Sequence, residues 1–253
     1  TAETANPTQL FVGNEGTLGL ITEATLHVEP MPTHRAYRGF HVPNVDAGLT
    51  AIREIMQSGL RPSVVRLYDA ADTLVKGGGT EGADPEADGD GAAGEDSLVE
   101  KVLETLPAGI AAEIRKAVER AKNDVRGSVL RVLANRPKLV NAVADHLGSE
   151  AFLIVGFDGH DRLIKREAEV AFEMVRSHGE DLGTEPGENW RRHRYDASYK
   201  QSPVFEAGTF VDTMEVSAPW QGVRGLYRAV RRALARHALV MAHFSHVYRD
   251  GTS

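Results

Sequence analysis

Two hydrophobic periodicities follow one another in an order that limits the folds open to this chain of 253 residues. Residues 35–42 and 62–68 have the alternation and the β-branched or aromatic content typical of strands. Between them, residues 45–58 place apolar side chains on one face of a helix. Further along, the pattern predicts strands over 151–158, 210–216 and 238–248, and helices over 162–178 and 223–237. This order predicts an α+β fold, with an antiparallel or mixed sheet of about five strands and helices packed on one face.

A long insertion separates the second strand from the third. At about 77–97 it is rich in Gly, Ala, Asp and Glu and has no Lys or Arg, so we expect a disordered surface segment. At about 98–148 the spacing predicts a helical insert. The acidic segment holds seven of the 36 acidic residues, which accounts for the net charge of −7. The rest of the chain is neutral, and this argues against a nucleic-acid partner.

Composition excludes several kinds of site. The chain has no cysteine, so it has no disulfide framework, no thiolate metal site and no cysteine nucleophile. It also has no apolar run long enough for a transmembrane helix. We therefore expect a cytoplasmic protein, for which peripheral membrane contact and a homodimer stay open.

Three glycines, Gly13, Gly16 and Gly19, lie in an apolar frame within residues 11–25. Glycine permits positive φ and close approach of the backbone to a ligand. The spacing matches neither the dinucleotide fingerprint nor the P-loop. It is compatible with a tight turn before a strand over 18–28, or with a loop whose main chain contacts a polar cofactor.

A single arginine, Arg66, stands in the middle of the otherwise apolar strand predicted over 62–68. A buried guanidinium needs a partner. Arg66 either faces water at a sheet edge, pairs with Asp69, or faces an anionic or electron-rich ligand such as a flavin carbonyl or a phosphate.

A basic and aromatic segment occupies residues 190–200, with Arg191, Arg192 and Arg194 among its cations. Such a cluster can hold an anionic group through charge-assisted contacts. The alternative is a solvated helix face anchored in the core by Trp190.

The last candidate site lies near the C-terminal end, at residues 243–248. His243 and His246 are three residues apart, which on a strand places them on opposite faces, and no third ligand is nearby in the sequence. We therefore expect no metal site. Tyr248 follows; a tyrosine ordinarily loses its proton near pH 10, so it needs a cationic neighbour to act as a base. The alternative is a half-buried structural tyrosine.

Residues 11–25, Phe-Val-Gly-Asn-Glu-Gly-Thr-Leu-Gly-Leu-Ile-Thr-Glu-Ala-Thr, resemble a late flavin-contacting loop of the FAD-linked oxidase superfamily of the vanillyl-alcohol oxidase type. The resemblance implies FAD as cofactor. It makes residues 1–32 the C-terminal piece of an FAD-binding domain of the PCMH type and residues 33–253 a substrate or cap domain. The implied FAD-contacting residues are Glu15, Gly16, Thr17, Leu18, Gly19, Leu20 and Ile21.

Four further motifs resemble the alkyldihydroxyacetonephosphate synthases and their bacterial relatives. They are Val-Val-Arg-Leu-Tyr-Asp (64–69), Arg-Tyr-Asp-Ala-Ser-Tyr (194–199), Val-Asp-Thr-Met-Glu-Val-Ser-Ala-Pro-Trp (211–220) and Phe-Ser-His-Val-Tyr-Arg-Asp-Gly (244–251). This resemblance implies that Arg66 lies by the flavin and that Arg194, or Arg192 in another register, holds the substrate phosphate. It also implies that Tyr248 removes the substrate α-proton and that His246 contacts the substrate.

The implied reaction exchanges the acyl chain of an acyl-dihydroxyacetone phosphate for a fatty alcohol through a flavin adduct, without net redox. The substrate is accordingly a small molecule or lipid. The family's first flavin half and its histidine-rich loop have no counterpart here, so we expect a fragment that is inactive alone. Two alternatives stay open: an FAD-dependent dehydrogenase of a 2-hydroxy acid or other small alcohol, and a non-catalytic ligand-binding module.

Overall fold

The computed structural model describes four main stretches of the chain: residues 6–75, 150–160, 162–195 and 210–253. It also describes isolated positions at 108, 109, 111, 112, 115, 116, 137, 138, 141, 205 and 208. The predicted acidic insertion at 77–97 and nearly all of the predicted helical insert at 98–148 therefore lie outside the described residues. The chain divides into two compact units, residues 1–32 and residues 33–253.

The described residues of the first unit contain one short helix, α1 (Pro7–Phe11), followed by a glycine-containing turn. Asn6 caps the helix by accepting a hydrogen bond from the Thr8 N–H at 3.0 Å. The strand predicted over 18–28 is not formed, and these residues are extended backbone without strand pairing. Their alternating apolar side chains stand in solvent, with Leu20 89% exposed. The prediction was wrong because alternation indicates a strand only where a neighbouring strand accepts its hydrogen bonds.

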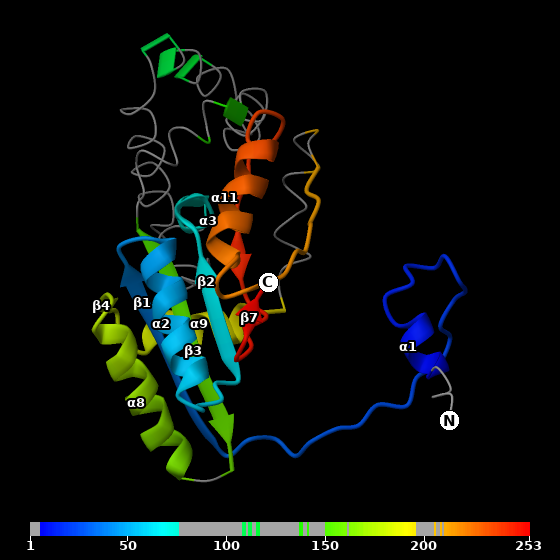
Figure 1. Ribbon diagram of the computed structural model, residues 1–253, viewed down its shortest axis with the longest axis vertical. Helices are drawn as coiled ribbons and strands as arrows, with labels where there is room; N and C mark the ends of the chain where they lie inside the picture. Colours follow the sequence, from blue (N-terminus) through cyan, green and yellow to red (C-terminus); the bar gives the residue numbers. More distant parts are fainter. Residues whose placement is uncertain are drawn as a thin grey trace. The chain divides into compact units, whose positions relative to one another are not determined.

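The second unit is built on a five-stranded sheet in the order β4-β1-β3-β2-β6 (Figure 1). Its strands are β1 (His34–Val42), β2 (Val64–Tyr68), β3 (Ala151–Gly159), β4 (Glu180–Asp181) and β6 (His243–Phe244). All neighbouring strands are antiparallel. Because β3 lies between β1 and β2, the predicted β-α-β unit is split, with its two strands parallel but not adjacent. The predicted α+β fold is confirmed.

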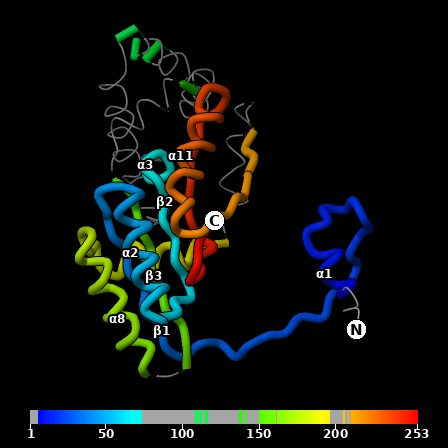
Figure 2. The backbone as a smooth tube through the Cα atoms, in the orientation of Figure 1, coloured from blue at the N-terminus to red at the C-terminus, as the bar shows by residue number. Residues whose placement is uncertain are grey.

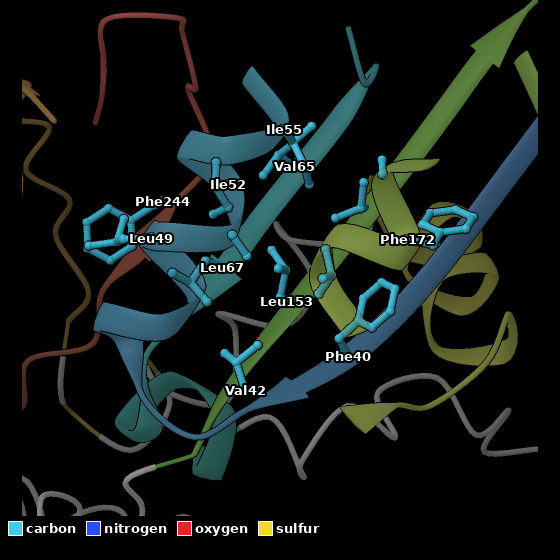
Figure 3. Packing of buried hydrophobic residues seen from close by; sticks show 14 of the residues in the cluster. Phe40, Val42, Leu49, Ile52, Ile55, Val65, Leu67, Leu153, Phe172 and Phe244 are labelled. Carbon is cyan, nitrogen blue, oxygen red and sulfur yellow. The ribbon is translucent and has the colours of Figure 1, made fainter. Parts of the chain in front are cut away.

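Two amphipathic helices, α2 (Val45–Gln57) and α8 (Leu163–Arg176), cover one face of the sheet (Figure 1). Figure 3 shows Leu49, Ile52 and Ile55 of α2 packed toward the strands, and Phe172 of α8 near Phe40 of β1. On β2 and β3 the residues that point to this core are Val65, Leu67, Leu153, Val155 and Phe157. The strand residues between them point to the opposite face, because side chains alternate along a strand.

The opposite face carries a shorter helix, α9 (Glu185–His193), which packs against β1 and β3. Close approach is possible because of glycine. A Cβ on Gly187 would lie 2.8 Å from the backbone nitrogen of Arg38, and one on Gly39 would lie 2.7 Å from the Pro186 Cβ. Trp190 of α9 packs on a second apolar cluster made by Tyr68, Phe152 and Ile154. Beside the predicted helical layer there is thus a helix on the other face.

Helix α11 (Val223–Leu234) lies beside α3 (Ala70–Val75) and β2 (Figure 2). A buried ion pair joins them, because Arg231 Nη1 donates to the Asp69 carboxylate at 2.8 Å. The Tyr227 hydroxyl donates to the same oxygen at 3.0 Å. Burial raises the pKa of Asp69, against the lowering effect of the Asp72 N–H and of Arg231.

The C-terminal strand predictions were wrong in extent. Residues 210–216 form no strand, and of 238–248 only His243 and Phe244 pair with β2. After them the chain turns back, so that β7 (Gly251–Thr252) pairs with β5 (Ala218–Pro219) in a separate two-stranded sheet. The apolar alternation of this region serves the turn and the small sheet instead of one long strand.

Candidate functional site

The sheet face opposite α2 and α8 carries Arg66 at the middle of β2. Val65 and Leu67 point into the core, so Val64, Arg66 and Tyr68 share the other face. The Arg66 guanidinium carbon lies 5.4 Å from the centroid of the Tyr68 ring, in a cation–π contact. The Tyr68 ring in turn stacks on Phe152, with 5.9 Å between ring centroids and 19° between planes. Arg66 thus lies on an aromatic floor.

The Arg66 donors are unequally used. Its Nη2 lies 3.0 Å from His243 Nε2, whereas its Nε is buried and has no hydrogen-bond partner among the described residues. The suggested pairing with Asp69 is wrong, because Asp69 is held by Arg231 and Tyr227 of α11. A buried N–H without an acceptor is costly, so the Nε edge marks a place where a ligand oxygen would be stabilised.

His243 connects Arg66 to a buried carboxylate. Its Nδ1 lies 3.6 Å from Asp72 Oδ2, and the Asp72 side chain is only 3% exposed. In the sequence, His243 stands out only as a possible metal ligand, and Asp72 does not stand out at all. The neighbourhood depends on the antiparallel pairing of His243 with Tyr68, which joins positions 175 residues apart and leaves no local signal.

The predicted anion-binding cations of α9 are partly neutralised within their own helix. Arg191 Nε lies 2.8 Å from Glu188 Oε2, and Arg192 Nη2 lies 2.8 Å from Glu185 Oε1. Arg194 follows the helix; its guanidinium carbon lies 4.4 Å from the Tyr195 ring centroid and it donates to the Arg191 carbonyl. Of the two arginines predicted to bind a phosphate, Arg194 and Arg192, Arg194 is the one without a carboxylate partner among the described residues. The rest of the segment, from 196 to 200, lies outside those residues.

Tyr248 and His246 lie in the C-terminal turn. The Tyr248 side chain is 60% exposed and lines a pocket of about 310 Å³ with Ser217, Asp250 and neighbouring residues. His246 Nδ1 lies 2.8 Å from Glu215 Oε1. Hydrogen bonds from Ser253 and His246 lower the pKa of Glu215. Within the described part of the chain, no hydrogen bond, ion pair or ring contact joins Tyr248 to Arg66 or Arg194.

The glycine-spaced loop, which lies within residues 1–32, adopts the positive φ angles that its glycines predicted. Gly13 and Gly16 have φ of 80° and 79°, and Glu15, between them, has φ of 50°. A Cβ on either of these two glycines would meet nothing within 4 Å, so they are required by the left-handed backbone and not by crowding. Leu18, Leu20 and Ile21 all project into solvent.

The described residues lack two kinds of feature. None of their helices is long and apolar enough to cross a membrane. No cluster of three or more His, Asp or Glu side chains in that part of the chain could hold a metal ion. His243 and His246 have separate surroundings there, the first beside Arg66 and Asp72 and the second beside Glu215.

Most of the chain matches a known protein family. Residues 31–93 and 99–253 match the family described as FAD linked oxidases, C-terminal domain. The chain belongs to this family, and FAD is the cofactor that the membership indicates.

Some relatives match nearly the whole of this chain, and others match only a short segment of it. The chain is 23% identical to an alkyldihydroxyacetonephosphate synthase of Dictyostelium discoideum over 97% of its length, which is 35% of that protein. A solved structure of alkyldihydroxyacetonephosphate synthase superposes with a TM-score of 0.61 at 22% identity and shares the fold over all of this chain and 41% of its own. A shorter match, 44% identical over 63 residues, joins 24% of this chain to 11% of a mitochondrial D-lactate dehydrogenase (cytochrome) of Arabidopsis thaliana. The chain therefore spans about a third of the length of the synthase it matches.

The described residues fit FAD. The loop offers left-handed main chain with open space at Gly13 and Gly16, and exposed apolar side chains at Leu18 and Leu20 for an aromatic ring system. In residues 33–253, Arg66 offers a buried donor that has no partner in the described part of the chain, which suits a carbonyl or phosphate oxygen.

Proposed function

We propose that the polypeptide carrying this chain is an FAD-dependent enzyme that makes an alkyldihydroxyacetone phosphate from acyl-dihydroxyacetone phosphate. The acyl chain is exchanged for a fatty alcohol and leaves as a fatty acid, so no net oxidation takes place. Residues 33–253 supply the substrate-binding sheet. The observation that carries the proposal is the buried Arg66 Nε on an aromatic sheet face, which has no hydrogen-bond partner among the described residues. A relative that matches 97% of the chain is an alkyldihydroxyacetonephosphate synthase.

Each predicted site residue has a role in this proposal. Residues Glu15 to Ile21 hold FAD through their main chain, and bound FAD supplies the electron-accepting ring that the exchange requires. Arg66 donates to a carbonyl or phosphate oxygen from β2. Arg194, with Arg192 as the alternative, binds the substrate phosphate from the end of α9. Tyr248 takes the proton from the carbon beside the substrate carbonyl, and His246 contacts the substrate from the same turn.

A second candidate function is the oxidation of a 2-hydroxy acid, supported by the 44% identity of a short segment to a D-lactate dehydrogenase. In that case Arg66 or Arg194 binds the substrate carboxylate as it would a phosphate, because a guanidinium matches both groups.

An exchange assay separates the two functions. The polypeptide that carries this chain is loaded with FAD and given acyl-dihydroxyacetone phosphate and a labelled fatty alcohol. The synthase proposal predicts label in an ether product and release of fatty acid, with the flavin absorbance unchanged at the end. Anaerobic bleaching of the flavin by D-lactate, with no ether product, would overturn it in favour of the dehydrogenase.

The partners and the location of the protein are part of the same proposal. A small-molecule or lipid substrate, a homodimer, peripheral contact with lipid and a cytoplasmic location all accord with the synthase proposal. Light scattering of the purified polypeptide would check the homodimer, and its sedimentation with phospholipid vesicles would check the peripheral contact with lipid.

A further inference from the structure

We propose that His243 is a positioning residue that holds the Arg66 guanidinium so that its Nε–H faces the ligand, with Asp72 fixing the histidine from behind. The inference rests on the proposed function only in taking that ligand to be FAD or its substrate. The arrangement of the three side chains is a property of the sheet itself.

The first step is the direction of the hydrogen bond between Arg66 and His243. A guanidinium donates and cannot accept, so His243 Nε2, at 3.0 Å from Arg66 Nη2, must be the unprotonated acceptor. The ring proton of the neutral histidine is then on Nδ1. That atom lies 3.6 Å from the Asp72 carboxylate, longer than a hydrogen bond but close enough for the carboxylate to favour an N–H pointing toward it.

The second step is the rigidity of the three positions. His243 lies opposite Tyr68 in the β2–β6 pairing, and the backbone N–H of Asp69 donates to the Ala242 carbonyl at 2.9 Å. The Asp72 N–H donates to Asp69 Oδ1 at 2.9 Å, which holds the start of α3 against the end of β2. Elements that are far apart in the sequence thus fix the acceptor, the aromatic floor and the carboxylate relative to Arg66.

These contacts restrict the rotation of the Arg66 guanidinium. The Tyr68 ring supports the guanidinium plane and His243 engages one end of it, so rotation about the last side-chain bond is restricted. The Nε–H is left as a buried donor without a hydrogen-bond partner among the described residues. Loss of the His243 acceptor would free the guanidinium to rotate, and the ordering would then have to come from ligand binding energy.

Protonation provides a readout that a purely structural role would not give. The groups facing His243 among the described residues are Arg66 from β2, Asp72 from α3 and the Tyr68 ring. A proton on Nε2 would remove the acceptor and place a positive charge beside Arg66. The orientation of Arg66 is therefore maintained only while His243 is neutral at Nε2.

The tautomer is measured directly by nitrogen-15 NMR of the polypeptide labelled in its histidine rings, with the His243→Gln variant used for assignment. We expect His243 to carry its proton on Nδ1 at neutral pH and to shift toward the Nε2–H form in Arg66→Met. A ring that carries its proton on Nε2, or one that Arg66→Met leaves unchanged, would overturn the inference. This measurement uses no substrate, so its failure is distinct from failure of the proposed function.

The kinetic consequence is tested in the exchange assay. His243→Leu is expected to lower kcat/KM about tenfold, while His243→Gln, which keeps an acceptor, recovers part of the loss. His178→Leu, which removes a histidine paired with Glu54 at 2.8 Å, is the matched control and should retain full activity. In an Arg66→Met background, His243→Leu should cause no further loss. An equal loss in both backgrounds would show that His243 does not act through Arg66.

Discussion

A guanidinium in the middle of an apolar strand persists because its donors find acceptors, and at Arg66 one donor has none in the described protein. The Arg66→Met variant should lose kcat/KM by about a hundredfold, since a hydrogen bond from a charged donor contributes about 1.5–3 kcal/mol. Arg66→Lys keeps the charge without the forked geometry and should recover only part of it. Steady-state kinetics with the FAD-loaded polypeptide checks this. Full activity of Arg66→Met, with unchanged thermal unfolding, would exclude Arg66 from the site.

Asp181 should make the stability of the fold depend on pH in the acid range. Burial alone would raise the pKa of Asp181, but hydrogen bonds from the Gly183 N–H, Arg176 and Arg38 outweigh it and hold the pKa below its usual value. A carboxylate with a lowered pKa in the folded state stabilises the fold above its unfolded pKa of about 4 and loses this contribution as the pH falls through the folded value.

The corresponding variant is Asp181→Asn. It should lower the free energy of unfolding by about 2 kcal/mol near neutral pH, because Arg38 and Arg176 lose their shared acceptor. Urea unfolding at a series of pH values from neutral to about 3 measures the difference, which should shrink as the pH falls. A difference that does not depend on pH would contradict the assignment.

Among the elements, α9 tests how the second face of the sheet is built. A Cβ on Gly187 would meet backbone atoms of Tyr37 and Arg38 at 2.8 to 3.0 Å, and backbone cannot move aside as a side chain can. Gly187→Ala should therefore displace α9 and cost about 1–3 kcal/mol of stability. The control is Gly225→Ala in α11, where a Cβ would meet nothing within 4 Å and should stabilise the helix by about 0.5–1 kcal/mol. Equal effects in thermal unfolding would show that the close contact does not matter.

The elements also show where sequence patterns are informative. β1, α2, β3 and α8 were predicted nearly to their ends, because each buries its apolar residues on the face that its own period defines. Residues 18–28 and 210–216 have comparable alternation but no strand partner in the described structure. Pairing is a non-local property, and the alternation of a single segment does not reveal it.

The same limit applies to the candidate site. The glycine loop was predicted because positive φ is a local demand, and Arg66 because a charge in an apolar strand is conspicuous. His243 reaches Arg66 only through the β2–β6 pairing, and Glu185 and Glu188 neutralise Arg192 and Arg191 through the geometry of α9. The roles of residues 15–21, Arg66, Arg192, Arg194, His246 and Tyr248 in binding and catalysis all stay predictions.

At the scale of the whole molecule, the buried hydrophobic core lies within residues 33–253, whereas the described residues of 1–32 bury no large apolar side chain. Residues 33–253 expressed alone should therefore unfold cooperatively with nearly the same midpoint as the complete chain. They should not bind FAD, because residues 15–21 are missing. Thermal unfolding and equilibrium dialysis check the two halves. Loss of folding on removal of 1–32 would show that the first unit belongs to the core.

We propose that residues 15–21 bind FAD, and a fluorescence titration of the polypeptide carrying this chain with FAD tests this most directly. We predict saturable binding of one FAD per polypeptide, and weaker binding in Gly16→Ala, where the left-handed backbone of φ 79° becomes strained. Flavin fluorescence that remains unchanged at every protein concentration would contradict the account.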